Sequence, residues 1–305
     1  MKKNKRVVII PTFCEAHLIK LQIPNLINTI KPDVIIYNEG MFPAGPESNT
    51  QVDDEFIKKF TLDGVRGFDF EETQRIINMA KLEYPDVEII LQKMDYPEKQ
   101  HSINCFIQAC TSFGDIEIEE GDILFPLEPD VFHHHDSADE IDEYIEQLEP
   151  NQGFRSIWVD FIETQYYCEK WNLLPFSDMD NFDPEAGRSR RVGIKFGDMK
   201  WYKNVLSNFM SQNYTMLNPT DLFTFHYPWF KFGKYKALRY AQLNRKAGYL
   251  EFWDGALDVI RKNETGQDVM IRNSTDLDNP KIYAGYVEID HPEEMKQHEN
   301  WLSEE

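Results

Sequence analysis

Short apolar runs alternate with longer amphipathic stretches along the first half of the chain. Each apolar run is typical of a buried strand, and the runs span residues 6–10, 33–37, 87–91 and 123–127. The amphipathic stretches carry apolar residues near helical spacing and span 15–30, 71–82, 100–113 and 136–148. This alternation predicts an α/β fold of the Rossmann type, with a mostly parallel sheet and helices on both faces.

The second half of the chain has a less regular pattern. It contains an apolar strand-like segment, a polar loop with an arginine cluster, an aromatic segment and a basic helical stretch, at 153–163, 177–191, 223–230 and 231–245. No linker composition clearly divides the chain. We expect a nucleotide-binding core over residues 1–230 and a helical extension over 231–305. Because no linker separates the two, the extension should pack on the core.

Composition narrows the class of protein. The chain has 305 residues, 41% of them apolar, and a net charge of −21. Such a charge opposes non-specific adhesion to nucleic acid or anionic membranes. The four cysteines lack zinc-type spacing, and no apolar window approaches the roughly 20 residues of a membrane span. These features predict a cytoplasmic protein with reduced thiols and no membrane association.

Two carboxylates, Glu128 and Asp130, directly follow the apolar run 123–127. Ligands bind beyond the carboxyl ends of the strands in open α/β sheets, so an acid-x-acid pair is well placed there. Carboxylate oxygens suit Mg²⁺ or Mn²⁺. Acid-x-acid pairs also arise by chance in a chain with 53 acidic residues, and the preceding strand is what favours a metal site here.

The ordered set of Glu15, Glu39, Glu128-Pro129-Asp130 and a late His226 resembles glycosyltransferases of the GT-A fold. The opening of the chain looks most like the β-1,4-mannosyl-glycoprotein N-acetylglucosaminyltransferase family and its bacterial and phage relatives. The usual Asp-x-Asp is Glu-Pro-Asp here, so the chain departs from the pattern of the family at Glu128 and keeps it at Asp130. The resemblance implies a metal-dependent transferase that uses a nucleotide-sugar donor, with a UDP-sugar favoured and Mn²⁺ or Mg²⁺ as cofactor.

The resemblance also implies roles for individual residues. Asp130 would bind the metal, Glu128 would contact the ribose or the metal shell, and His226 would complete the ligand set; packing of His226 among aromatic residues is the alternative. The residues expected to bind the donor are Pro11, Thr12, Glu15, Glu39, His101, Glu128, Arg190 and Arg191.

An inverting transferase needs a general base beside the acceptor hydroxyl. Glu163 and Asp254 are the candidates, because each follows an apolar or aromatic segment. The sequence His133-His134-His135 is a weaker candidate metal site, in which at most His133 and His135 would converge if the backbone were extended. A solvated loop or a loop that lines the acceptor site is the favoured interpretation of this segment.

The acceptor and two alternative functions stay open at this stage. Phage relatives suggest a hydroxymethylated base in phage DNA as one acceptor, with the basic stretch 231–245 on the DNA backbone and the host cytoplasm as the location. A glycan or a small molecule is the other option. A nucleotidyltransferase that releases pyrophosphate and a catalytically silent glycan- or partner-binding protein are the alternatives to a glycosyltransferase.

Overall fold

The computed structural model describes a discontinuous set of segments of the chain. These are residues 4–12, 15–40, 70–94, 118–162, 164–169, 189–197, 216–217, 222–229, 259–262, 268–271, 282–286, 289–298 and 301. All structural statements below concern these residues.

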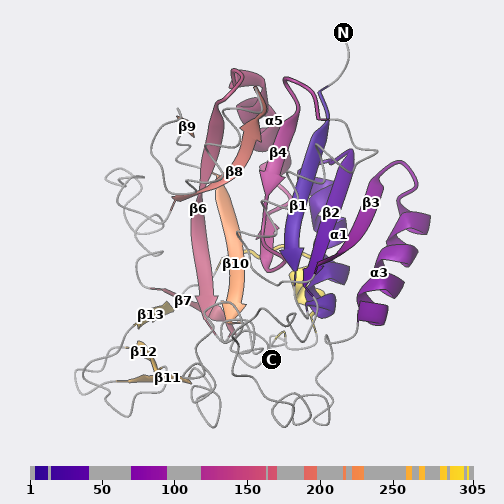
Figure 1. Ribbon diagram of the computed structural model, residues 1–305. Coiled ribbons are helices and arrows are strands. Elements are labelled where there is room, and N and C mark those ends of the chain that lie inside the picture. The colour runs from indigo at the N-terminus through magenta and orange to yellow at the C-terminus, as the bar shows by residue number, and fades with distance from the viewer. Residues whose placement is uncertain are drawn as a thin grey trace, which may run out of the picture.

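Four parallel strands form the first half of the sheet (Figure 1). They lie in the order β4-β1-β2-β3, with bounds β1 Arg6–Thr12, β2 Val34–Gly40, β3 Glu88–Met94 and β4 Ile123–Pro126. The register pairs Thr12 with Glu39, so the polar residues that end β1 and β2 are neighbours. The four apolar runs of the sequence are therefore the parallel strands that were predicted.

The remaining strands make the sheet mixed. Their bounds are β5 Val131–His133, β6 Gly153–Ile162, β7 Thr164–Glu169, β8 Ser189–Lys195, β9 Met216–Leu217, β10 Phe223–Trp229, β11 Val259–Lys262, β12 Asp268–Ile271 and β13 Ile282–Tyr286. Strand β8 runs antiparallel between β4 and β6, and β10 runs parallel to β6. The carboxyl ends of β1, β6 and β10 consequently point to the same edge of the sheet, the lower edge in Figure 1.

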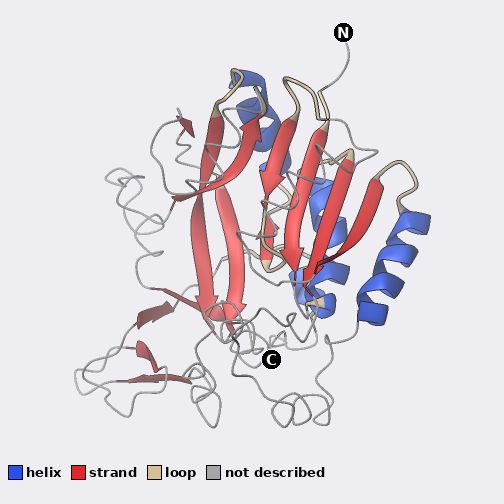
Figure 2. Cartoon of the chain, viewed as in Figure 1, coloured by secondary structure: helices blue, strands red, loops and turns tan. Residues whose placement is uncertain are grey.

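Three helices pack on one face of the sheet, and they are blue in Figure 2. Helices α1 Ala16–Thr29, α3 Phe70–Glu83 and α5 Ser137–Gln147 share an apolar core with the sheet, and α1 contacts both of the others. Pro24 lies inside α1 without ending it. A short 3₁₀ turn, η4 Met295–Gln297, lies near the C-terminus.

The other face of the parallel strands is buried as well. Val7, Ile9, Ile36 and Leu124 alternate with the helix-facing residues and are at most 2% exposed. Strands that are buried on both faces have continuous apolar sequences, which explains why these runs do not alternate with polar residues. The α/β fold class predicted from the sequence is confirmed. Helices were expected on both faces of the sheet, and the three described helices pack on one face.

The structure describes only some of the elements that were expected in the less regular parts of the sequence. Residues 189–191, expected in a polar loop, belong to β8 and pair with β6. The helical stretches expected at 100–113 and 231–245 lie outside the described residues. Within 231–305 the described elements are β11, β12, β13 and η4, and the division at residue 230 stays a prediction.

A segment near the C-terminus packs on the core of the sheet. The segment 289–298 packs through Met295 onto Phe161 and Tyr227, together with Ile289 and Trp301. Among the described residues, no helix has the length and apolarity needed to cross a membrane.

Candidate metal centre

The turn between β4 and β5 presents Glu128 and Asp130 at the carboxyl edge of the sheet. The chain stays beside β1 just past β4, because the Leu127 N–H donates to the Ile9 carbonyl at 3.0 Å. The buried Gln22 side chain of α1 then donates to the carbonyls of Glu128 at 2.6 Å and Val131 at 3.1 Å. Helix α1 therefore holds the backbone of this turn.

His226 reaches the same place from β10. In this strand it lies between Val131 of β5 and Asp160 of β6, and the next residue, Tyr227, donates its N–H to the Asp130 carbonyl at 2.9 Å. The order β5-β10-β6 thus brings a residue that is distant in sequence next to the acidic turn.

Three side chains from these elements converge at the sheet edge. His226 Nε2 lies 3.3 Å from Asp130 Oδ1 and 3.9 Å from Glu128 Oε2. One potential ligand atom from each residue lies within 4.8 Å of the others, a spacing at which they could hold a metal ion. The Asp130 and His226 side chains are buried, and that of Glu128 is 13% exposed, so the group opens on the Glu128 side.

Asp160 lies behind His226 and was not recognised from the sequence. Its Oδ1 makes a short hydrogen bond with His226 Nδ1, and the Asp160 side chain is buried. A carboxylate on one ring nitrogen of a histidine fixes the tautomer and directs the other nitrogen toward a ligand. The only sequence signal for Asp160 was a lone acid within the apolar strand Ile157-Trp158-Val159-Asp160-Phe161.

Trp158 packs against the imidazole and limits its movement. Its ring centroid lies 4.7 Å from that of His226, at an interplanar angle of 55°. The aromatic neighbourhood expected for a packed histidine is therefore present together with the acidic partners, and the two interpretations of His226 are compatible.

Polar residues at the ends of β1 and β2 line the same edge of the sheet. Thr12, Glu15, Asn38 and Glu39 are all at most 5% exposed. The Thr12 hydroxyl and both atoms of the Asn38 amide are buried and find no hydrogen-bond partner among the described residues. Buried polar groups are nearly always hydrogen-bonded, so these atoms are candidates for contacts with a ligand. Asn38 had not been singled out, although it immediately precedes Glu39.

Other predicted site residues are not brought together by the described structure. Glu163, Asp254 and His101 lie outside the described residues. Pro11 lies in β1, and the backbone of Arg190 and Arg191 lies in β8 opposite Ser156 and Arg155. The roles of all six stay predictions.

The expectation for the three adjacent histidines was wrong in its pairing. Strand β5 ends at His133, which is completely buried, and burial lowers the pKa of its imidazole to about 4. His134 and His135 lie beyond the strand, with ring centroids 4.0 Å apart. The alternation rule did not apply, because the backbone leaves the extended conformation after His133.

Comparisons with known proteins add little to this geometry. The sequence matches no protein-family model, and none of the curated proteins matches it. Among solved structures, the crystal structure of S. aureus TarS is similar over 53% of this chain, with 13% sequence identity and a TM-score of 0.22. The similarity spans 22% of the TarS chain, and a TM-score this low carries no argument for a shared fold or activity. The molecule is thus an α/β protein with a buried acidic and histidine group that could bind a metal.

Proposed function

We propose that the protein is a metal-dependent glycosyltransferase of the GT-A type, which transfers a sugar from a nucleotide-sugar donor to an acceptor hydroxyl. The observation that carries this proposal is the convergence of Glu128, Asp130 and His226 beyond the carboxyl ends of the central strands. In open α/β sheets, ligands such as nucleotides bind beyond the carboxyl ends of the strands. An acidic group in this position could hold a metal ion beside such a ligand.

The donor atoms of the group indicate which metal fits. Two carboxylates and one imidazole suit Mn²⁺, which accepts both oxygen and nitrogen ligands, better than Mg²⁺, which prefers oxygen and water. Asp130 and His226 would bind the ion, and Glu128, the most exposed of the three, would bind it directly or through water. A bound divalent ion supplies positive charge that stabilises a departing diphosphate.

The ends of β1 and β2 would bind the rest of the donor. The Asn38 amide offers both a donor and an acceptor, which suits the edge of a base. Thr12 pairs with Glu39 in the register, so its hydroxyl lies on the same face of the sheet as the Glu39 carboxylate and suits a ribose. The neighbouring Glu39 is a candidate acceptor for a ribose hydroxyl. Glu163 and Asp254 remain our candidates for the general base, and Arg190, Arg191 and His101 for contacts with the donor.

The first test measures binding of UDP and UDP-sugars by calorimetry, with and without Mn²⁺. We expect Mn²⁺-dependent binding in the wild type and its loss in Asp130→Asn, which keeps the shape of the side chain. Asp122→Asn is the matched control. Asp122 is also buried, but it accepts backbone N–H groups of Lys5 and Glu119 at the opposite end of β4, so its replacement should leave nucleotide binding intact.

The outcomes separate the candidate functions. Release of a nucleoside diphosphate from the donor supports the glycosyltransferase, and release of pyrophosphate from a nucleoside triphosphate would indicate a nucleotidyltransferase. Absence of binding to any nucleotide, with or without metal, would contradict both and favour a silent binding protein.

The acceptor is tested separately. If hydroxymethylated DNA is the acceptor, the affinity of the protein for this DNA should fall steeply with added salt. Contacts from Lys and Arg to phosphates release counterions, and added salt opposes this release. The net charge of −21 makes this dependence informative, since binding would require a local basic surface. Transfer to a free glycan with little response to salt would exclude DNA.

A further inference from the structure

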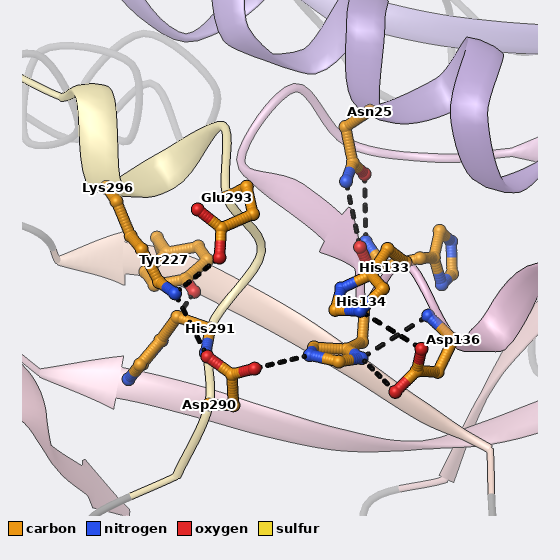
Figure 3. A network of polar contacts seen from close by, with 10 residues as sticks. Asn25, His133, His134, Asp136, Tyr227, Asp290, His291, Glu293 and Lys296 are labelled. Carbon is orange, nitrogen blue, oxygen red and sulfur yellow. Dashed lines mark hydrogen bonds and ion pairs between the residues drawn. The ribbon is translucent and has the colours of Figure 1, made fainter.

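A second group of potential metal ligands lies in the turn between β5 and α5 (Figure 3). Asp136 Oδ2 lies 3.4 Å from His134 Nδ1, and Asp136 Oδ1 lies 3.0 Å from His135 Nε2. The side chains of His135 and Asp136 are more than half exposed, whereas that of His134 is 17% exposed. Two imidazoles and a carboxylate therefore face one another at the surface.

The position of Asp136 makes this arrangement informative. Asp136 is the N-cap residue of α5, where an aspartate usually accepts a hydrogen bond from a backbone N–H of the first turn. Here the side chain makes no capping hydrogen bond. The carboxylate instead faces the two imidazoles, which is the orientation that metal binding requires.

Asp290 fixes the orientation of His134 from a distant part of the chain. His134 Nε2 lies 3.2 Å from Asp290 Oδ2. The other oxygen, Oδ1, accepts from Lys296 Nζ and from the His291 N–H, each at 3.0 Å (Figure 3). These contacts hold the pKa of Asp290 at about 2, first through Lys296 and then through His134.

The partner of Nε2 determines the role of Nδ1. The Asp290 carboxylate can accept a proton from Nε2, and in that tautomer the lone pair of His134 lies on Nδ1, beside Asp136. The Asp136 N–H lies 3.4 Å from the same Nδ1 and faces it as a donor, which agrees with this tautomer. A carboxylate that binds the second nitrogen of a ligating histidine is a common feature of protein zinc sites.

We propose that His134 Nδ1, His135 Nε2 and the Asp136 carboxylate form a second metal site, which binds a divalent transition ion of the Zn²⁺ type. Imidazole ligands favour Zn²⁺, Co²⁺ and Ni²⁺ over Mg²⁺, and water would complete the coordination of this exposed site. Asp290 is the positioning residue.

A metal at this place would tie two segments together. His134 follows β5 directly, and Asp290 precedes η4, which packs on the core through Met295. Binding to His134 would strengthen its hydrogen bond to Asp290 and so fasten the C-terminal segment to the turn. This role does not depend on the proposed transferase activity.

The test is a titration of the full chain with Co²⁺, followed by its visible absorption and by calorimetry. The background is Asp130→Asn, which removes a ligand of the buried centre. In this background we expect one Co²⁺ that Zn²⁺ displaces and Mg²⁺ does not. Adding His135→Asn or Asp136→Asn should abolish the signal, and Asp290→Asn should weaken affinity about 10- to 100-fold.

A matched control and a second measurement keep the result clear. Asp139→Asn removes one exposed carboxylate from the first turn of α5 without touching the group, and Co²⁺ binding should be unchanged. Zn²⁺ at about 100 times its dissociation constant should raise the melting temperature by about 4 °C. Binding that is unaffected by His135→Asn, or that appears only at millimolar metal, would show adventitious surface binding and overturn the proposal.

Discussion

His226 has two ring nitrogens with different partners, and this difference determines what the side chain can do. Nδ1 bonds to Asp160, and Nε2 faces Asp130 and Glu128. The pair His226–Asp160 joins residues 66 positions apart, so the sequence around His226 gives no indication of it. Asp130, by contrast, was identifiable because its environment, the end of an apolar run, is local.

Asp160 provides the first prediction at this scale. Asp160→Asn keeps the shape of the side chain but replaces the carboxylate with an amide, which stabilises the ligating tautomer of His226 less well. We expect Mn²⁺ affinity to fall about 10- to 100-fold with the fold intact. Calorimetric titration with Mn²⁺ and circular dichroism of the variant provide the measurement, and unchanged affinity would remove Asp160 from the site.

His133 provides a prediction about pH. Burial lowers its pKa to about 4, below the usual value of about 6.5. Between these two values the unfolded chain binds a proton that the folded protein does not, so stability falls as the pH decreases through this range. The loss should be about 1.4 kcal/mol per pH unit, or about 3 kcal/mol in all.

The variant His133→Gln tests this contribution. His17 and His298 also have lowered pKa values, at about 3 and about 4, so the wild type should lose stability steeply below pH 6.5. The free energy of unfolding, measured with urea between pH 7 and 4.5, should depend less steeply on pH in the variant. The difference in slope should correspond to the uptake of about one proton fewer on unfolding. Identical slopes in both proteins would mean that His133 is protonated in the folded state.

At the scale of elements, α1 has a function beyond packing. Its side chains hydrogen-bond to the backbone of the turn before β5 and to the edge of β5 that faces away from β10. In a continuous sheet, another strand would bond to this edge. Asn25 donates to the His133 carbonyl at 2.8 Å and accepts from the His133 N–H at 2.9 Å, while Gln22 holds the Glu128 carbonyl. The helix thus covers the open edge of β5 and fixes the turn that carries the candidate metal ligands Glu128 and Asp130.

Asn25→Ala tests this function. The substitution leaves the buried N–H and C=O of His133 without their partner, and each such group costs about 1–3 kcal/mol. We expect a clear loss in the free energy of unfolding, measured with urea, and weaker Mn²⁺ binding. Asn28→Ala is the control, because Asn28 lies on the exposed side of the same helix and donates to the Glu294 side chain at 3.2 Å rather than to the backbone of β5. Equal effects of both variants would contradict the role of Asn25.

Element prediction succeeded where periodicity decides the structure. The spacing in 15–30, 71–82 and 136–148 predicted α1, α3 and α5 nearly to their ends, because helices place one apolar stripe toward the core. The aromatic segment 223–230 was not recognised as a strand, and it became β10. Phe223, Phe225 and Tyr227 alternate with Thr224 and His226, which is the period of two that marks a strand, so the signal was present in the sequence and was missed.

At the scale of the whole molecule, the C-terminal segment completes the core beside the candidate site. Met295 is fully buried and packs with Phe161 and Tyr227, and the Tyr227 hydroxyl bonds to His291 Nδ1 at 2.8 Å. Tyr227 directly follows His226 in β10. Residues beyond 230 therefore support the strand that carries His226, a candidate metal ligand.

Met295→Ala measures this support. Removing a fully buried methionine should cost about 2–5 kcal/mol through lost burial and the resulting cavity. Met79→Ala is the control, since Met79 is 57% exposed on α3 and its loss should change stability by no more than about 0.5 kcal/mol. Thermal and urea unfolding of both variants provide the comparison. A small effect of Met295→Ala would favour a core that is complete at residue 230.

The sequence by itself determined the α/β class, the parallel strands and the position of Glu128 and Asp130. These features depend on periodicity and on neighbours along the chain, which any single sequence displays. Only the tertiary structure decided that β10 lies between β5 and β6, that Asp160 orients His226, and that His134 and His135 rather than His133 face Asp136. These contacts depend on strand order and on the point where the backbone leaves the extended conformation. Both result from packing over the whole molecule, and no local pattern in the sequence encodes them.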